Sequence, residues 1–171
     1  MERNKKRFFH YILACVGIII GVAADQITKS LAVTHLRGKE PYIIIKNVFQ
    51  LEYLENRGAA FGLFQNQTFF FWISLLLIAA FFFWFYSKVP MERRFLPLRI
   101  CAVLIMAGGL GNFIDRIRFR YVIDFFYFVL IDFPVFNVAD IYVTIAVFGC
   151  VLLLFFYYKE EELERLFHRG K

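Results

Sequence analysis

Two residue types that build many active sites are scarce in this chain of 171 residues, which contains three cysteines and three histidines. Cys15, Cys101 and Cys150 lie inside apolar runs, and neither their spacing nor their odd number fits a zinc site or a closed disulfide framework. We interpret them as small buried apolar residues. The histidines are scattered and form no HExxH or HxxxH pair, so a metallopeptidase is poorly supported. The sequence therefore predicts no metal site.

Charge is nearly absent from four long stretches of the chain. They are residues 8–24, 69–86, 95–114 and 141–158, and each approaches the roughly 20 apolar residues that cross a bilayer core. Hydrophobic residues make up 60% of the chain and 24 residues are phenylalanine, which is more apolar surface than a soluble domain of this length can bury. We predict one domain spanning residues 1–171, an all-α polytopic membrane protein with four transmembrane helices.

The basic residues are concentrated in three short segments. Residues 1–7, 87–99 and 159–171 together hold 12 Lys and Arg in 33 residues, whereas the loops 34–67 and 115–138 hold 7 in 58 residues. Basic residues favour the cytoplasmic side of a membrane, so this distribution places both termini inside and both long loops outside. The net charge of +6 is explained by this pattern, and we expect no nucleic-acid partner. The tail 159–171 is interpreted as a solvated continuation of the fourth helix.

The first long loop contains a strand pattern. Phe49, Leu51 and Tyr53 alternate with Gln50 and Glu52, a period of two that is typical of a half-buried strand. Residues 46–47 form a plausible turn before it. We expect a small extracytoplasmic β-sheet near the membrane surface, followed at residues 56–62 by a loop of small residues, where the backbone can approach a ligand closely.

Two acidic residues lie at the facing ends of successive membrane-length segments, and each follows an asparagine by three residues. These units are Asn112 with Asp115 and Asn137 with Asp140. The predicted topology puts both acids at the same outer depth, together with Asp25. Peptide hydrolysis needs a base that activates water and an acid that protonates the carbonyl oxygen, and two close carboxylates sharing one proton supply both. The asparagine amides can orient the acids or hold a substrate backbone.

Purely structural interpretations of these residues remain open. Asn137 can be a helix N-cap with Asp140 at the third helical position. Asp115 can be a boundary residue, and Asp25 can end the first helix in the headgroup region with Lys29 as its partner one turn later. Nearby glycines at 108, 109 and 111 can simply permit close helix packing.

Five ordered blocks of the sequence resemble those of bacterial lipoprotein signal peptidase, also called signal peptidase II. The blocks are DQITK at 25–29, NRGAAFG at 56–62, GGLGNFIDR at 108–116, VIDF at 122–125 and FNVAD at 136–140. They occur in family order with the family's helix spacing, over about residues 8–158. One departure is Arg120, where the family pattern leads us to expect a small residue, often glycine.

The resemblance implies a four-helix membrane aspartic endopeptidase of the bacterial cytoplasmic (inner) membrane, with its active site at the extracytoplasmic face. Its substrates would be prolipoproteins, cut just before a diacylglyceryl-modified cysteine. Asp115 and Asp140 would form the catalytic pair, and Asp124 would shape the outer loop. The residues expected to bind substrate or support the site are Asp25, Asn56, Gly58, Gly108, Asn112, Arg116, Asn137 and Ala139. No metal or organic cofactor is implied, and we expect a monomer in contact with membrane lipids.

Two other functions use the same residues differently. A proton- or cation-coupled transporter or channel can carry its ion on intramembrane carboxylates. Such acids would lie along the helices, whereas these are predicted at helix ends, and the chain shows no internal repeat. A non-catalytic membrane scaffold would use the polar residues only as helix caps.

Overall fold

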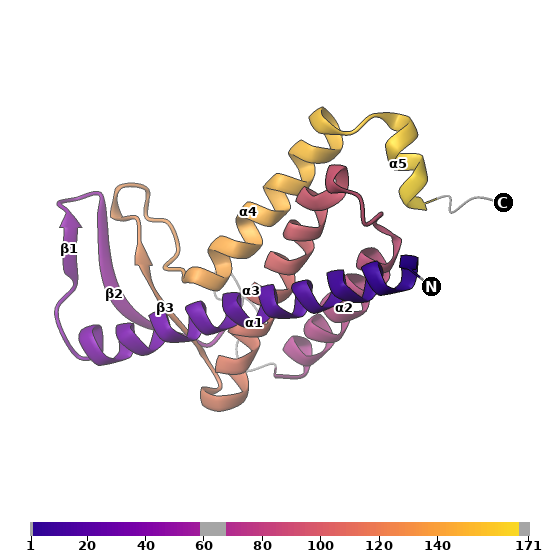
Figure 1. The fold of residues 1–171 in the computed structure, drawn as a ribbon. Coiled ribbons are helices and arrows are strands. Elements are labelled where there is room, and N and C mark those ends of the chain that lie inside the picture. Colours follow the sequence, from indigo (N-terminus) through magenta and orange to yellow (C-terminus); the bar gives the residue numbers. More distant parts are fainter. Residues whose placement is uncertain (1, 59–67, 168–171) are drawn as a thin grey trace.

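The computed structural model describes residues 2–58 and 68–167. Helices and a small sheet alternate along the chain (Figure 1). The elements are α1 Glu2–Leu36, β1 Tyr42–Ile45, β2 Phe49–Asn56, α2 Thr68–Lys88, the 3-10 turn η2 Arg93–Phe95, α3 Leu96–Phe119, β3 Val122–Tyr127, the 3-10 turn η3 Val129–Ile131, α4 Val138–Leu152, the π-helical turn η4 Leu153–Tyr157, and α5 Glu160–Phe167.

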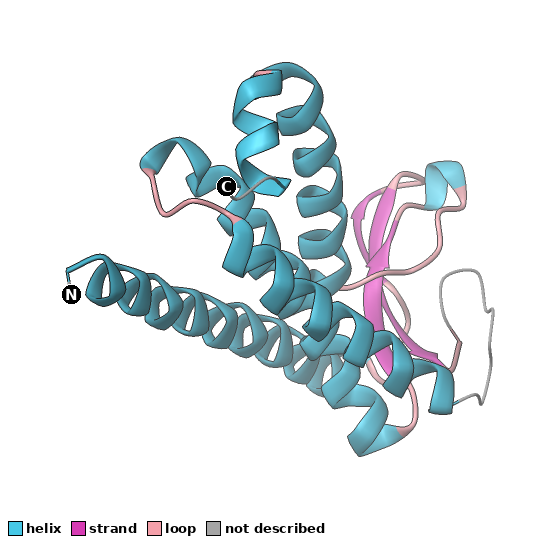
Figure 2. Cartoon of the chain, turned by 90° about the vertical axis from the view of Figure 1, so that its right-hand side faces the viewer, coloured by secondary structure: helices cyan, strands magenta, loops and turns pink. Residues whose placement is uncertain are grey.

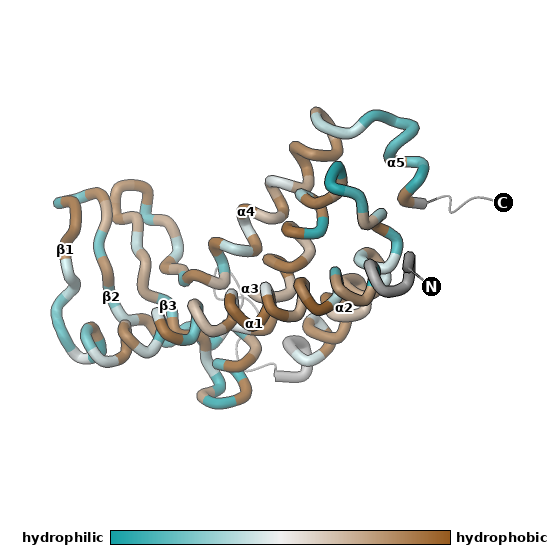
Figure 3. Tube along the Cα trace, in the orientation of Figure 1, coloured by the Kyte–Doolittle hydropathy of each residue, from teal (hydrophilic) through white to brown (hydrophobic). Residues whose placement is uncertain are grey.

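Within the described residues, three helical segments are long and apolar enough to cross a membrane. They are Arg7–Leu36, Arg93–Phe119 and Val138–Tyr157, and α2 contributes a shorter apolar segment, Trp72–Lys88. The four predicted spans thus correspond to four apolar helices. That all four of them cross the membrane stays a prediction. Apolar residues predominate along α1 to α4, whereas polar residues gather at the ends of these helices, in the turns and on α5 (Figure 3). Phe155 and Phe156 of η4 are 77% and 83% exposed, an arrangement that lipid solvation makes favourable.

Helix α3 lies among the other helices and packs closely on α1 and α4. Small residues allow this approach: a Cβ atom at Gly21 of α1 would lie 2.9 Å from Ala107 Cβ of α3. A Cβ atom at Gly108 would lie 2.5 Å from the Ala139 carbonyl oxygen of α4. These glycines therefore bring the polar ends of α1, α3 and α4 together, as small-residue packing does in membrane bundles.

Two helices extend beyond their apolar runs. The first helix is expected to end in the segment 25–29, but α1 continues to Leu36, because its last turns pack against the sheet. There Ala32 and Leu36 form a buried cluster with Ile123 and Phe125 of β3. Helix α3 likewise continues past Asp115 to Phe119, so Asp115 lies inside a helix rather than at a loop boundary.

The predicted sheet is confirmed, with strand β2 covering the alternating residues. Its three strands pair antiparallel in the order β1-β2-β3 (Figure 1), and Figure 2 shows the strands together beside the helices. Asn47 has a φ of 59°, which confirms the turn expected at residues 46–47. The small-residue loop that follows β2 lies outside the described residues from position 59 onward.

The tail is not a continuation of the fourth helix. Tyr158 is extended, and α5 folds back so that Leu163 and Leu166 pack against Val89, Phe95 and Leu98. Arg94 reinforces the turn with two hydrogen bonds to the Glu162 carboxylate, at 2.9 and 3.1 Å. The start of α1 and α5 lie at the opposite end of the molecule from the sheet (Figure 1).

Candidate active site

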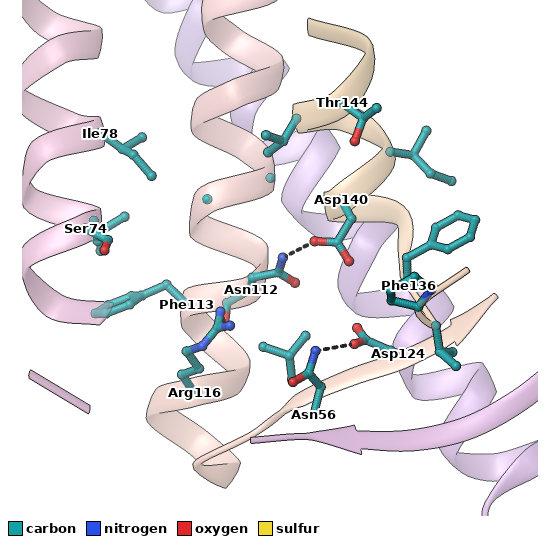
Figure 4. A pocket seen from close by; sticks show the side chains of 18 of the residues that line it. Asn56, Ser74, Ile78, Asn112, Phe113, Arg116, Asp124, Phe136, Asp140 and Thr144 are labelled. Carbon is teal, nitrogen blue, oxygen red and sulfur yellow. Dashed lines mark hydrogen bonds between the residues drawn. The ribbon is translucent and has the colours of Figure 1, made fainter. Parts of the chain in front are cut away.

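A cavity of about 590 Å³ opens between α2, α3, α4 and the sheet. Five of its polar side chains come from four elements: Asn56 from β2, Asn112 and Arg116 from α3, Asp124 from β3, and Asp140 from α4 (Figure 4). Apolar residues complete the wall on both sides. Leu75, Ile78, Phe113, Ile141 and Val143 come from the helices, and Val122, Phe133, Pro134, Val135 and Phe136 come from β3 and the segment that follows it. The cavity therefore combines largely apolar walls with a small group of charged and amide side chains.

Asp140 is fixed at the start of α4 by a capping box. Asn137 accepts a hydrogen bond from the Asp140 backbone N–H at 3.1 Å, and Asp140 Oδ2 accepts one from the Asn137 backbone N–H at 3.1 Å. Asn137 is therefore the N-cap of α4, the structural interpretation that the sequence left open. The other carboxylate oxygen, Oδ1, accepts from Asn112 Nδ2 at 2.8 Å (Figure 4). The Asp140 side chain therefore lies at the positive end of the α4 dipole.

Asp124 lies on β3 and is held by two neutral amides. Its Oδ2 accepts from Asn56 Nδ2 at 2.9 Å, and its Oδ1 accepts from Asn137 Nδ2 at 2.6 Å. The residue is 1% exposed. Burial, followed by the negative charge of Asp140, raises the pKa of Asp124 to about 7. Asp124 is therefore the acid of this cavity that can carry a proton near neutral pH.

Arg116 brings a positive charge to the same cavity. Its guanidinium donates to the Gly58 carbonyl oxygen at 3.1 Å and to the Asn112 carbonyl oxygen at 3.3 Å. The Gly58 backbone N–H in turn donates to Asn56 Oδ1 at 3.0 Å. These bonds tie the end of β2 to α3 and orient the Asn56 amide toward Asp124.

Asp115 lies behind the cavity rather than in its wall. It is 1% exposed and forms an ion pair with Lys29 of α1 at 2.9 Å. Its other contacts are also internal: Gln26 Nε2 donates to Oδ1 at 2.8 Å, and the Ile123 backbone N–H donates to Oδ2 at 3.2 Å. The described residues that line the cavity contribute two carboxylates, those of Asp124 and Asp140.

Asp25 belongs to this same internal cluster. It is fully buried, forms an ion pair with Lys29 at 2.9 Å, and accepts from the Ala139 backbone N–H at 3.0 Å. Gly111 makes room for it, because a Cβ atom there would lie 2.5 Å from Asp25 Oδ2. Asp25 thus has Lys29 as its partner one turn later, as the structural interpretation allowed, but the pair lies within the protein.

Comparison with known proteins matches these features to one family. The family model described as signal peptidase (SPase) II matches residues 17–156. A lipoprotein signal peptidase of Clostridium tetani is 40% identical over 150 residues, covering 86% of this chain and 93% of that protein. Another, from Streptococcus pyogenes serotype M1, is 38% identical over 158 residues, covering 92% and 97% respectively. The chain belongs to the signal peptidase II family.

The fold agrees with this membership. A solved structure described as a bacterial membrane enzyme superposes with a TM-score of 0.75 at 28% identity, covering 86% of this chain and 92% of that one. A second structure of the same description gives a TM-score of 0.72. The protein is thus a membrane enzyme and an aspartic-type protease of the signal peptidase II family.

Most of the predicted site residues of this signal peptidase II chain are brought together. Asn56, Gly108, Asn112, Arg116 and Asp140 line the cavity. Gly58, Asn137, Ala139 and Asp25 contact those residues or their backbone from outside it. Asp115 is nearby but faces α1. Among the described residues, no group of three or more His, Cys, Asp or Glu side chains is arranged to hold a metal.

The sequence patterns did not indicate that Asp124 lies in the cavity wall or that Lys29 contacts Asp25, Asp115 and Asn112. A signal existed for Asp124, which is the acidic residue in the otherwise apolar strand segment VIDF. A carboxylate in such a strand is costly to bury unless it is hydrogen-bonded. For Lys29, the signal was its position one turn after Asp25 on a face that α3 covers.

Proposed function

We propose that this signal peptidase II cleaves prolipoproteins at the amide bond before a diacylglyceryl-modified cysteine, with Asp124 and Asp140 as its catalytic pair. The observation that carries the proposal is that both carboxylates line one cavity, held by neutral amides. This differs from the Asp115–Asp140 pair expected from sequence. The geometry favours Asp124, because both Asp115 oxygens are already bonded inside the protein and its charge is paired with Lys29.

The different surroundings of the two acids assign their roles. Asp140, at a helix N-terminus, is the ionised base and takes a proton from the attacking water. Asp124, whose pKa is raised to about 7, gives its proton to the carbonyl oxygen of the scissile amide. The resulting tetrahedral diol collapses as protonated Asp140 passes its proton to the leaving amine and one diol hydroxyl returns its proton to Asp124. Each acid thus ends in its starting state.

The cavity shape supports a lipidated substrate. Its walls are largely apolar and include Leu75 and Ile78 of α2 and Ile141 and Val143 of α4, and the two carboxylates lie in the same cavity. An acyl chain kept in the bilayer can contact these apolar walls while the peptide amide lies between the acids. Arg116 is placed to offset the negative charge of the pair during the reaction.

We also propose where in the cell the protein lies and how it is oriented in the membrane. We place the protein in the bacterial cytoplasmic membrane as a monomer surrounded by lipid, with the cavity and sheet at the extracytoplasmic face. The basic segments 1–7 and 159–171 support this orientation, because α1 begins and α5 lies at the end of the molecule opposite the sheet.

The test is cleavage of a diacylglyceryl-modified prolipoprotein by purified protein, run beside the same substrate without the lipid. Wild type should cleave the lipidated form only, and Asp124→Asn and Asp140→Asn should each abolish cleavage while remaining folded. If Asp124→Asn cleaves normally and Asp115→Asn is inactive although fully stable, the pair is Asp115–Asp140. Failure of a well-folded wild type to cleave at all would refute the proposed substrate.

A further inference from the structure

Lys29 is a buried cation with every donor used. Its ammonium lies 2.9 Å from Asp25 Oδ2, 2.9 Å from Asp115 Oδ2 and 2.9 Å from Asn112 Oδ1. The side chain is 2% exposed, so no solvent competes for these contacts. An ammonium carries three donors, and all three are satisfied by groups on α1 and α3.

Each of the three acceptors makes a second contact that reaches the proposed catalytic pair. Asn112 donates directly to Asp140 Oδ1 at 2.8 Å. Asp115 accepts from the backbone N–H of Ile123, the residue before Asp124, at 3.2 Å. Asp25 accepts from the backbone N–H of Ala139, the residue before Asp140, at 3.0 Å. One ammonium therefore connects to both acids through three separate paths.

The path through Asn112 also fixes the orientation of an amide. Asn112 Oδ1 accepts from Lys29 at 2.9 Å and from Asn137 Nδ2 at 3.0 Å. If the amide flipped, its NH₂ group would face two donors and its oxygen would face the Asp140 carboxylate. Both contacts would be repulsive, so the ammonium keeps an N–H directed at Asp140 in the cavity (Figure 4).

We propose that Lys29 is a positioning residue for the catalytic pair, acting through Asn112, Asp115 and Asp25 rather than by touching substrate. The inference rests on the proposed Asp124–Asp140 chemistry. A misplacement of reacting groups by about 1 Å can cost on the order of 100-fold in rate, so a shared anchor behind both acids has a large effect on turnover. Substrate binding depends instead on the cavity wall, which Lys29 does not line.

The direct test is Lys29→Met, compared with Lys46→Met at the exposed turn before β2. For the folded fraction of Lys29→Met, kcat should fall on the order of 100-fold while KM for the lipidated prolipoprotein stays close to wild type. Lys46→Met should match wild type in both constants. If folded Lys29→Met has wild-type kcat, Lys29 only stabilises the fold and the proposal is overturned.

A charge-balanced variant covers the case in which Lys29→Met does not fold. Lys29→Met with Asp115→Asn removes one charge of each sign, and its reference is Asp115→Asn alone, which keeps the contacts of Lys29 with Asp25 and Asn112. The double variant should have a kcat at least tenfold below this reference, within the range that a lost alignment gives. Equal kcat values in the two proteins would refute the positioning role.

The pH–rate profile supplies a readout that a purely structural role would not move. The charged groups around Asp124 are Asp140 and Arg116 in the cavity, and Lys29 behind it with its partners Asp25 and Asp115. Because the charge of Lys29 lowers the pKa of Asp124, its removal should move the limb of the profile governed by Asp124 to higher pH. An unshifted profile in the double variant, relative to Asp115→Asn, would contradict the proposal.

Asn112→Asp tests the same path without altering Lys29. The carboxylate introduced by this substitution can still accept from Lys29 and Asn137, but it cannot donate to Asp140 while ionised. The kcat of this variant should be low at pH 7 and partly recover at acidic pH, where one shared proton restores the contact. Wild-type kcat at pH 7 would overturn the proposal, whereas cleavage by Asp124→Asn would instead remove the catalytic pair on which it rests.

Discussion

The polar end of the bundle contains two neighbouring groups of carboxylates with opposite properties. Asp25 and Asp115 share a buried cation, Lys29, and lie behind the cavity. Asp124 and Asp140 receive hydrogen bonds from neutral amides and line the cavity. Lys29 offsets the negative charge of the first group, whereas two amide-held carboxylates in one cavity can share one proton. The partners of each acid, rather than its residue type or its depth, therefore determine whether it can take part in proton transfer.

The largest expected effect is the loss of activity when either carboxylate of the cavity is replaced. Asp124→Asn and Asp140→Asn should each lower kcat by about 10²–10⁴-fold, because each removes an acid or base from the reaction. Asp124→Asn should be more stable than wild type at pH 7, because it removes a buried carboxyl group whose stabilising protonation is largely lost by that pH. Cleavage kinetics with the lipidated substrate, combined with thermal unfolding in detergent, checks both parts.

Asp115→Asn should instead affect the stability of the protein more than its activity. It removes a charged acceptor from Lys29 and should destabilise the protein by about 1–3 kcal/mol, with a smaller loss of kcat than either cavity variant. A fully stable but inactive Asp115→Asn protein would show that the internal group is not purely structural and that the two groups do not differ in this way.

Packing around the internal group provides a second contrast. Gly111→Ala should destabilise the protein by about 1–3 kcal/mol, because the new Cβ would lie 2.5 Å from Asp25 Oδ2. Gly109→Ala is the matched control on the same helix, since its Cβ would meet Ile78 at 3.4 Å and fit without clash. Chemical unfolding of the two variants tests this prediction. Equal free energies of unfolding would show that Asp25 and its partners can shift to make room for the new Cβ atom.

The pH dependence of stability should reveal the cavity group. The pKa of Asp124 is raised to about 7 in the folded protein from an ordinary 3.8, so the folded state binds the proton more tightly. Protonation of Asp124 therefore stabilises the folded state. This contribution to the unfolding free energy is complete below pH 3.8, declines as the pH rises, and is lost above about pH 7, a total change of about 4 kcal/mol. The difference in unfolding free energy between wild type and Asp124→Asn, measured from pH 4 to 8, should change with that slope. Parallel curves would mean that Asp124 is ionised throughout.

How much of this could be read from the sequence depends on the kind of information each residue carries. Uncharged runs of membrane length predicted the apolar helices, the alternation at residues 49–53 predicted β2, and the spacing of Asn137 and Asp140 predicted a cap, because each is a local pattern. The choice between Asp115 and Asp124 is not local. It depends on α3 continuing to Phe119, which turns Asp115 toward Lys29 and leaves β3 to bring Asp124 into the cavity.

Arg120 lies at the corner between α3 and β3. One carboxylate of the internal group lies on α3 before this corner, and one carboxylate of the cavity group lies on β3 after it. The expectation of a small residue here has a physical reason, since Arg120 ends α3 with a φ of 69° in the left-handed region. Glycine adopts this conformation without steric cost, so Arg120→Gly should stabilise the protein by up to about 1 kcal/mol and leave cleavage unchanged.

Arg118→Gly is the matched control for this smallest effect. Arg118 lies inside the last turns of α3, where glycine costs about 1 kcal/mol relative to a good helix former. The two substitutions remove the same side chain two residues apart, so opposite shifts in thermal unfolding would assign the effect to backbone conformation. A loss of cleavage in Arg120→Gly without loss of stability would instead show that the arginine side chain itself helps to hold β3, and with it Asp124, against α3.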